Sequence, residues 1–267
     1  MIRSMWSAVS GLRNHQIYLD VTGNNIANVN THGYKSTRAV FEDSLSQTIR
    51  GAANPDGENN VGGSNPTQVG LGVRLGQISG DFKQGGLQVT NVPTDMAIQG
   101  DGFFVVQRGE QKFYTRNGAF SLDKAGDLVT GDGSYVLNVD GEKINISSET
   151  YTSWQIAPNG TITGFSDDAP EGEEIAVLGV ARFNNPQGLD RVGGSMFRPT
   201  LNSGDPQVGQ PDTDGRGQVI QNTLELSNVD LAGEFTNLIM AQRGFQANSK
   251  IVTASDEVLN DLINMKR

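Results

Sequence analysis

Residues that could carry out chemistry are scarce in this sequence. Its 267 residues include no cysteine and only two histidines, His15 and His32. A chain without cysteine forms neither a disulfide framework nor a thiolate metal site. Two histidines leave little for zinc binding or acid–base catalysis. The Gly-x-Ser-x-Gly, phosphate-loop and His-Glu-x-x-His patterns are absent too. We therefore expect no catalytic residue, no metal ligand and no cofactor.

Two short stretches superficially match ligand-binding motifs. Gly70, Gly72 and Gly76 are spaced somewhat like a dinucleotide loop, but the helix and the later acidic residue that such a loop requires are missing. The sequence Asp-Thr-Asp-Gly at 212–215 is similar to part of a calcium loop, but it lacks the terminal glutamate and the flanking helices. We interpret the glycines as strand residues and the acidic stretch as a turn.

Binding without catalysis is a separate hypothesis. Trp154 and Tyr151 stand in a β-rich part of the chain and could stack against sugar rings. A β-rich carbohydrate-binding module is therefore the alternative of a different class. It leaves the patterns at both ends of the chain unexplained, and these patterns are the strongest in the sequence.

Both ends of the chain predict long amphipathic helices. Near the start, apolar residues alternate at spacings of three and four, and from residue 231 they recur every seven residues. The stretch 227–230 supplies capping side chains for the second helix. Such narrow heptad stripes are typical of coiled coils. They predict a polymerisation seam made of Ile2, Met5, Val9, Leu12, Leu19, Ile26, Leu231, Leu238, Phe245, Val252, Leu259 and Ile263.

The middle of the chain has the pattern of strands. Brief apolar runs alternate with turns rich in Gly, Asp and Asn. Residues 140–165 are expected to hold further strands, which include Ile144 and Ile146 and a hairpin turn at Asn159-Gly160. We predict an α+β protein with three parts. Residues 1–30 and 228–267 form a helical polymerisation domain, in which the two helices pair as a coiled coil. Residues 31–68 are an extended connector. Residues 69–227 form a mainly antiparallel, sandwich- or barrel-like outer domain, and whether it is one domain or two stays open.

The net charge of −10 is distributed unevenly. Residues 1–50 carry five Lys/Arg and three Asp/Glu, and residues 231–267 carry four of each, so the middle contributes −12. An acidic middle repels nucleic acid and anionic membranes. We find no run long enough to span a membrane and no cleavable signal peptide. On these grounds alone the protein would be cytosolic.

Three stretches resemble a known family. The first, at 20–35, reads DVTGNNIANVNTHGYK. The second, at 95–130, contains DMAIQGDGFFVV, YTRNGAF and DKAGDLVT, and the third, at 241–250, reads AQRGFQANSK. These strings are similar to the shared motifs of bacterial flagellar rod and hook subunits, and the likeness spans essentially the whole chain. The resemblance implies a structural subunit that polymerises with its own copies into a helical tube.

The resemblance also implies partners and a location. They are the other axial proteins of the rod, the hook cap and the hook–filament junction, and the flagellar type III export apparatus. Export without a cleaved signal would place the protein outside the cytoplasm, in the hook or basal body. Early export substrates carry a Phe-x-x-x-aliphatic element that is read by the export gate, and Phe41 with Leu45 matches it.

The family contains two candidate roles. The stretches 65–73 and 131–138 and the ending 262–267 are similar to the shorter type of hook protein, whereas the opening Met-Ile-Arg-Ser-x-Trp is rod-like. We therefore expect a subunit of the hook, which is the bendable universal joint between rod and filament. The alternative is a subunit of the distal rod, the driveshaft of the basal body.

Overall fold

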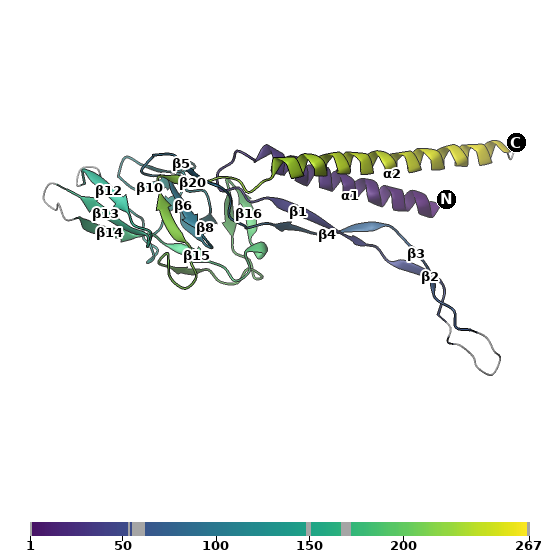
Figure 1. Ribbon diagram of the computed structural model, residues 1–267, viewed down its shortest axis with the longest axis horizontal. Coiled ribbons are helices and arrows are strands. Elements are labelled where there is room, and N and C mark those ends of the chain that lie inside the picture. The colour runs from purple at the N-terminus through teal and green to yellow at the C-terminus, as the bar shows by residue number, and fades with distance from the viewer. Residues whose placement is uncertain (1, 53, 55–61, 148–150, 167–171, 266–267) are drawn as a thin grey trace. The chain divides into compact units, whose positions relative to one another are not determined.

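The chain divides into two compact units. The computed structural model describes residues 2–52, 54, 62–147, 151–166 and 172–265. The helical unit comprises Met1–Ile26, Thr37–Ser79 and Asp230–Arg267, and the β-rich unit comprises Ala27–Ser36 and Gly80–Val229 (Figure 1). The two ends of the chain therefore belong to the same unit.

The helical unit contains both long helices and two β ribbons. Its elements are α1 (Ile2–Ala27), α2 (Leu231–Met265), β1 (Thr37–Asp43), β2 (Ser46–Arg50), β3 (Thr67–Gly70) and β4 (Val73–Gly80). β1 pairs with β4, and β2 pairs with β3. The predicted helices are confirmed. Strands occupy much of the range 31–68, which we expected to be a connector, and residues 53 and 55–61 of that range lie outside the described part.

Local chemistry explains where the helices begin and end. The Asp230 carboxylate accepts a hydrogen bond from the Ala232 N–H at 3.1 Å, which caps the start of α2. After α1 the chain turns through Gly33, which has a φ of +67°. This conformation is easy for glycine and disfavoured for other residues.

Short strands make up the β-rich unit. They are β5 (Leu87–Val89), β6 (Met96–Gln99), β7 (Phe103–Arg108), β8 (Gln111–Thr115), β9 (Phe120–Leu122), β10 (Leu128–Thr130), β11 (Tyr135–Val136), β12 (Ser153–Ile156), β13 (Thr161–Phe165), β14 (Glu173–Val177), β15 (Val180–Arg182), β16 (Asp190–Gly193), β17 (Met196–Arg198), β18 (Gln207–Gly209), β19 (Gln218–Gln221) and β20 (Thr223–Glu225), with a 3-10 turn at Pro186–Gly188.

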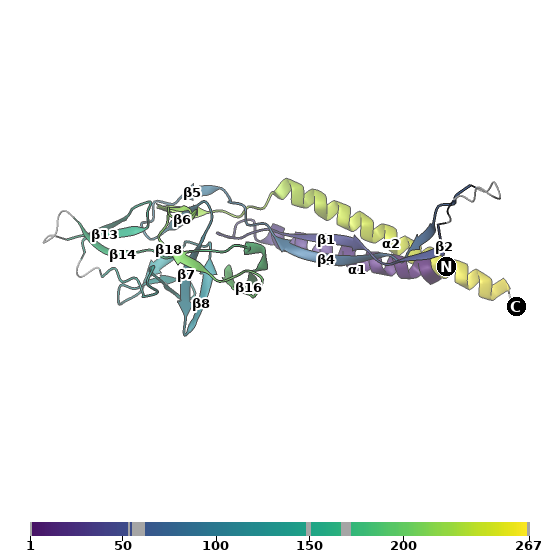
Figure 2. The ribbon, with the colours of Figure 1, turned by 90° about the horizontal axis from the view of Figure 1, so that it is seen from below.

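One large sheet dominates this unit. Among the described strands it has nine members, in the order β16-β17-β8-β7-β11-β10-β9, with β15 joining β7 to β18. β12, β13 and β14 form a smaller sheet, and β6 with β19 and β5 with β20 form ribbons (Figure 2). Every strand pair in this unit is antiparallel. The path of the large sheet ends at β16 and β9, so the expected barrel-like closure is not found among the described strands.

Glycine turns set the register of the hairpins. β7 and β8 are joined by two residues, Gly109 and Glu110, with Arg108 paired to Gln111. Gly109 has a φ of +63°, as a tight hairpin of this kind requires. The predicted hairpin turn at Asn159-Gly160 is confirmed, since Ile156 pairs with Ile162 across it.

Two apolar clusters form the core of the β-rich unit. The larger one includes Phe104, Leu128 and Leu178, and the smaller one includes Phe103 and Phe197. The smaller cluster is largely aromatic, with Phe103 and Phe197 ring centroids 5.6 Å apart in an edge-to-face contact. These side chains come from the short apolar runs of the sequence, which explains why the runs recur.

Candidate functional site: an assembly surface on the terminal helices

The two terminal helices lie side by side and antiparallel. Gly11 on α1 faces Asn248 on α2, and His15 faces Gly244. Asn25 donates a hydrogen bond to the Glu234 carboxylate at 3.0 Å. Moving one residue toward the C-terminus of α1 therefore corresponds to moving one residue toward the N-terminus of α2. Both chain termini accordingly lie at the same end of the helix pair (Figure 1).

Small and polar side chains fill the contact between the helices. The buried residues of α1 are Ala8, Gly11, Asn14, Thr22 and Asn25, and on α2 the buried residue is Ala241. A Cβ atom added to Gly244 would lie 2.3 Å from the His15 ring, so the helices approach closely at this point. At two points of the contact, therefore, a glycine on one helix makes room for a side chain of the other.

Asn14 and Asn25 connect α1 to the β1–β4 ribbon through hydrogen bonds. The Asn25 amide donates to the Thr37 carbonyl at 2.8 Å and accepts from the Thr37 N–H at 3.0 Å. Asn14 donates to the Val73 carbonyl at 2.7 Å. Asparagine in a helix is locally unfavourable, and these bonds explain its presence. Sequence periodicity did not identify either residue as important.

Replacement of Gly244 by alanine should weaken the helix pair. The added methyl group collides with His15, and overpacking of this kind typically costs about 1–3 kcal/mol. Gly23 is the matched control, since it also lies inside a helix but has open space around it. Gly23→Ala should stabilise α1 by up to about 1 kcal/mol through helix propensity. Hydrogen exchange of the helix amides measures both changes, and equal protection in the two variants would contradict the close contact.

The structure places the predicted seam beside this contact. Leu238, Val252 and Leu259 are half-buried, whereas Leu231 and Phe245 are 40% and 38% exposed and Ile263 is 66% exposed. On α1 the seam residues are all half-buried: Met5, Val9, Leu12, Leu19 and Ile26. Ile2 begins α1, and its side chain lies outside the described part. The heptad stripe thus flanks the α1–α2 contact and is only partly covered within one chain.

Further apolar side chains of the helices face solvent. Sequence periodicity did not single them out, because they lie off the main heptad stripe. They are Trp6 on α1 and Phe235, Ile239, Met240, Ile251, Val258, Leu262 and Met265 on α2. Large apolar side chains exposed in this number on two helices indicate an interaction site on a soluble protein. We call these residues, together with the heptad stripe, the assembly surface.

Phe41 and Leu45 are found on extended chain. Phe41 lies on β1 and packs edge-to-face on Tyr18 with ring centroids 5.8 Å apart. Leu45 lies between β1 and β2 and is 81% exposed. In an extended chain four residues span about 13 Å, so the two side chains do not form the compact pair that a helix would produce.

A buried charged cluster lies inside the β-rich unit. The Glu225 carboxylate accepts from the Lys35 ammonium at 2.7 Å and from the Arg116 guanidinium at 3.4 Å. The three side chains are at most 3% exposed. Lys35 follows α1 in the chain and Glu225 precedes α2, so the cluster joins the two crossover segments to the core. Sequence reasoning missed it, because the three residues are far apart in the chain.

Burial dominates the electrostatics of this cluster. Desolvation, and next the nearby Arg116 charge, lower the pKa of Lys35, while Glu225 opposes the shift. Desolvation also lowers the pKa of Arg116, against the attraction of Glu225. Arg116 donates further to the carbonyls of Ile98 and Gly100. Two cations thus share one carboxylate, which leaves a net charge of +1 in the cluster, and Arg116 Nε is buried without a hydrogen-bond partner among the described residues.

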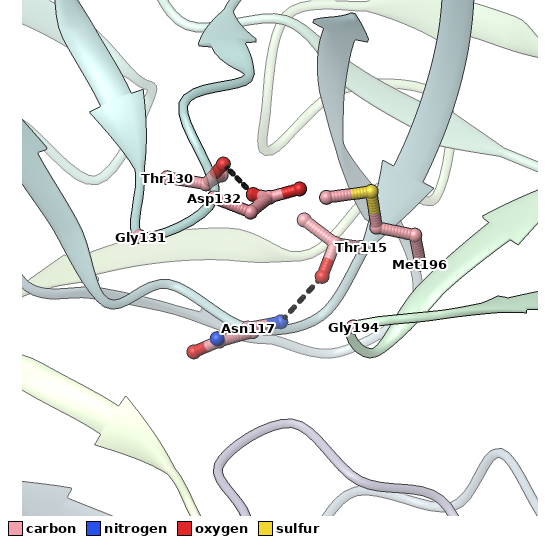
Figure 3. A pocket seen from close by; sticks show the side chains of 7 residues that line it. All are labelled: Thr115, Asn117, Thr130, Gly131, Asp132, Gly194 and Met196. Atoms are coloured by element: carbon pink, nitrogen blue, oxygen red, sulfur yellow. Dashed lines mark hydrogen bonds between the residues drawn. The ribbon is translucent and has the colours of Figure 1, made fainter.

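One hollow of about 210 Å³ lies on the β-rich unit. Figure 3 shows the side chains that line it, which are Thr115, Asn117, Thr130, Gly131, Asp132, Gly194 and Met196. Asp132 is the ionisable residue among them, and it accepts from Thr130 and pairs with Arg108 at 3.1 Å. Thr115 accepts from the Asn117 N–H at 3.0 Å. These polar groups are satisfied within the protein, so the hollow contains no free nucleophile or base.

The remaining chemical candidates lie apart. His15 belongs to the helical unit and His32 to the β-rich unit. Within the described ranges no group of three or more His, Cys, Asp or Glu is placed to hold a metal ion. The 212–215 stretch is a turn. Trp154, a candidate for sugar stacking, packs against the larger core cluster.

Comparisons with known proteins match the same stretches as the motifs. The description "Flagella basal body rod protein" matches residues 5–35. "Flagellar hook protein FlgE/F/G D1 domain" matches residues 97–164, and "Flagellar basal body rod FlgEFG protein C-terminal" matches residues 220–265. Two of these segments carry the terminal helices, and the third carries five of the nine strands of the large sheet, β7 to β11.

Full-length relatives are named as rod proteins. The flagellar basal-body rod protein FlgG of Bacillus subtilis is 44% identical over 268 residues, covering 100% of both chains. The protein of the same name from Borreliella burgdorferi is 38% identical, again over 100% of both chains. The flagellar hook protein FlgE of Borreliella burgdorferi is 27% identical over an alignment of 444 residues that covers both chains.

The fold and its uncovered helices are those of a structural subunit. The chain belongs to the flagellar rod and hook axial protein family, and the predicted family is thereby confirmed. Proteins of this family are structural components of the flagellum and not enzymes. Neither of the two described helices is long and apolar enough to cross a membrane.

The expectation of a hook subunit is corrected by these relatives. Relatives at 38–44% identity carry the rod name, whereas the hook relative is 27% identical. The hook expectation rested on a few short stretches, 65–73, 131–138, 241–250 and 262–267, and identity over the full length outweighs them. The alternative that we raised, the rod, is favoured.

Proposed function

We propose that this protein is a subunit of the distal rod, the driveshaft of the bacterial flagellar basal body. The observation that carries the proposal is full-length similarity to proteins named basal-body rod protein, at 44% and 38% identity. The subunit polymerises with copies of itself into a helical tube. It contacts other axial proteins, which include those of the rod and the hook cap.

The assembly surface supports polymerisation through the terminal helices. An isolated pair of helices gains little stability until its apolar side chains are covered. Here one chain leaves the heptad stripe half-covered and a second group of apolar residues exposed. In the polymer, neighbouring copies cover them, with the α1–α2 pair extended into coiled-coil contacts between subunits.

Charge supports an arrangement with the helices inside the tube. Residues 231–267 are balanced in charge, whereas the middle of the chain carries −12. Near-neutral helices pack against one another without strong repulsion, and acidic β-rich units repel each other and favour water. The helices therefore form the inner wall, and the β-rich domain that we expected at 69–227 faces outward.

Export through the flagellar type III apparatus belongs to the same proposal. The protein would leave the cytoplasm unfolded and without cleavage of a signal peptide. Recognition of Phe41 and Leu45 by the export gate then takes place on the unfolded chain, so their extended native conformation is no obstacle. A chain without cysteine avoids disulfide formation after export.

Electron microscopy of purified hook–basal bodies tests the assignment to the rod. The protein carries a label on an exposed loop of the β-rich unit. Label along the straight driveshaft is the expected result. Label on the curved external segment would identify a hook subunit and overturn the proposal.

Replacement of Phe245 by aspartate should abolish polymerisation. Phe245 is 38% exposed in a single chain, so the helix pair tolerates the change. In the polymer the carboxylate would be buried without a partner, at a cost of several kcal/mol. We expect the concentration required for assembly to rise about 100-fold or more, as measured by sedimentation. Asp256→Asn is the control on the exposed polar side of α2, and equal loss in both variants would argue against a specific surface.

A further inference from the structure

The register of the helix pair leaves one end of α2 unpartnered. Gly11 lies opposite Asn248, so Ile2, nine residues earlier on α1, is level with Glu257. α2 continues to Met265, which is eight residues or about 12 Å farther. This overhang carries Val258, Leu262 and Met265, which are 45%, 48% and 82% exposed. We name these three residues the distal patch.

A second apolar group lies at the opposite end of the same helix. Leu231, Phe235 and Ile239 are 40%, 50% and 57% exposed. They are spaced by four residues, so they share one face of α2. We name them the proximal patch. Asp261 borders the distal patch, since it precedes Met265 by four residues and lies about 40° from it around the helix, whereas Asp256 lies on roughly the opposite side.

The two patches point in opposite directions around α2. Their central residues, Phe235 and Leu262, are 27 positions apart in the sequence, which corresponds to about seven and a half helical turns and about 40 Å of rise. Two copies related by translation can bring two different patches together only when the patches face opposite ways. This condition is met here.

We propose that the distal patch of one copy docks on the proximal patch of the next copy along the polymer. The inference rests on the proposed function, since it names the contact through which the rod subunit would assemble lengthwise. The occupant is a second copy of this chain, because the overhang continues the same helix that already pairs with α1. A contact between two different patches is heterologous, so it propagates as an open filament and does not close into a dimer.

The geometry predicts a spacing and a strength. Successive copies joined by this contact are offset by about 40 Å along the helix axis. Three side chains on each side make a contact well below the size of a stable interface, which buries about 800 Å² per partner. The contact is therefore expected to be weak by itself and to depend on lateral contacts in the polymer.

Cysteine trapping tests the contact, because the chain contains no cysteine of its own. A disulfide requires the two Cα atoms to approach within about 7 Å, so it reports only a direct meeting of the patches. Both Phe235 and Leu262 are exposed, and their replacement by cysteine leaves the cores untouched. Assembled protein is oxidised and run on a non-reducing gel.

The doubly substituted chain, F235C with L262C, should give a ladder of multiples of 28.6 kDa. Each single variant should stay monomeric, and an equimolar mixture of the two should stop at the dimer. F235C with N260C is the matched control, since residue 260 is exposed and is turned about 160° away from residue 262, and this pair should give no ladder.

Three results would overturn the inference alone while leaving the proposed function standing. They are dimers from L262C by itself, an equal ladder from the N260C control, or no covalent product from the double variant in polymers that do form. Failure of the unsubstituted chain to polymerise at all would overturn the proposed function and this inference with it.

Discussion

Replacement of Glu225 by glutamine is expected to lower the free energy of unfolding of the β-rich unit by about 3–5 kcal/mol. The change keeps the shape of the side chain and removes its charge. Lys35 and Arg116 would then be two buried cations, at 0% and 3% exposure, without a carboxylate between them. Removing one partner of a buried ion pair costs far more than the pair contributes, because the remaining charge stays desolvated. Urea unfolding followed by tryptophan fluorescence measures the loss.

Asp190 provides the matched control for Glu225. Its carboxylate also accepts from an arginine, Arg198 at 2.6 Å, but the two side chains are about half exposed. Exposed ion pairs contribute about 0–1 kcal/mol, so Asp190→Asn should change stability by less than 1 kcal/mol. If Glu225→Gln were as mild as Asp190→Asn, the buried cluster would not hold the crossover segments to the core.

Replacement of Gly118 by alanine should prevent the β-rich unit from folding normally. A Cβ atom at this position would lie 1.6 Å from the Met96 carbonyl oxygen. The Met96 N–H also donates to the Gly118 carbonyl at 3.0 Å, so the two backbones cannot separate without losing this bond. We expect a loss above about 4 kcal/mol, in the range reserved for disrupted cores. Soluble yield and thermal unfolding of the variant provide the measurement.

Gly131 is the control for Gly118. It lies in the same unit, and an added Cβ atom would meet nothing within 4 Å. Gly131 does not have a positive φ, so alanine is tolerated in this backbone conformation. Gly131→Ala should change stability by less than about 0.5 kcal/mol. A stable, well-folded Gly118→Ala variant would contradict the close approach of these two backbone segments.

Much of the secondary structure was readable from the sequence. The heptad stripe predicted α2, and Asp230 predicted its start, because periodicity and capping are local properties. The hairpin at Asn159-Gly160 followed from turn chemistry in the same way. The apolar runs Phe103–Val106 and Phe113–Tyr114 became strands of the large sheet. One local prediction was incomplete, since Ile144 and Ile146 are buried yet lie outside the strands, where their backbones form hydrogen bonds with those of Leu128, Val136 and Gly126.

Family membership was also readable from the sequence, but the role within the family was not. The motifs at both ends and in the β block are shared by rod and hook proteins. They describe how an axial subunit folds and not where in the flagellum it stands. Comparison over the full length separates the two, since identity is 44% to a rod protein and 27% to a hook protein.

Only the tertiary structure decided which faces of the helices meet. Apolar periodicity favoured the leucine stripe as the contact, whereas Gly11, Gly244 and Asn248 form it. The reason is steric, because each glycine leaves room for the side chain that faces it, Asn248 over Gly11 and His15 over Gly244. The tertiary structure alone also showed that Lys35, Arg116 and Glu225 meet. These three residues are separated by 81, 109 and 190 positions in the sequence, so no local pattern connects them. Burying their charges costs free energy unless all three are removed from water together, so the cluster forms only in the folded protein.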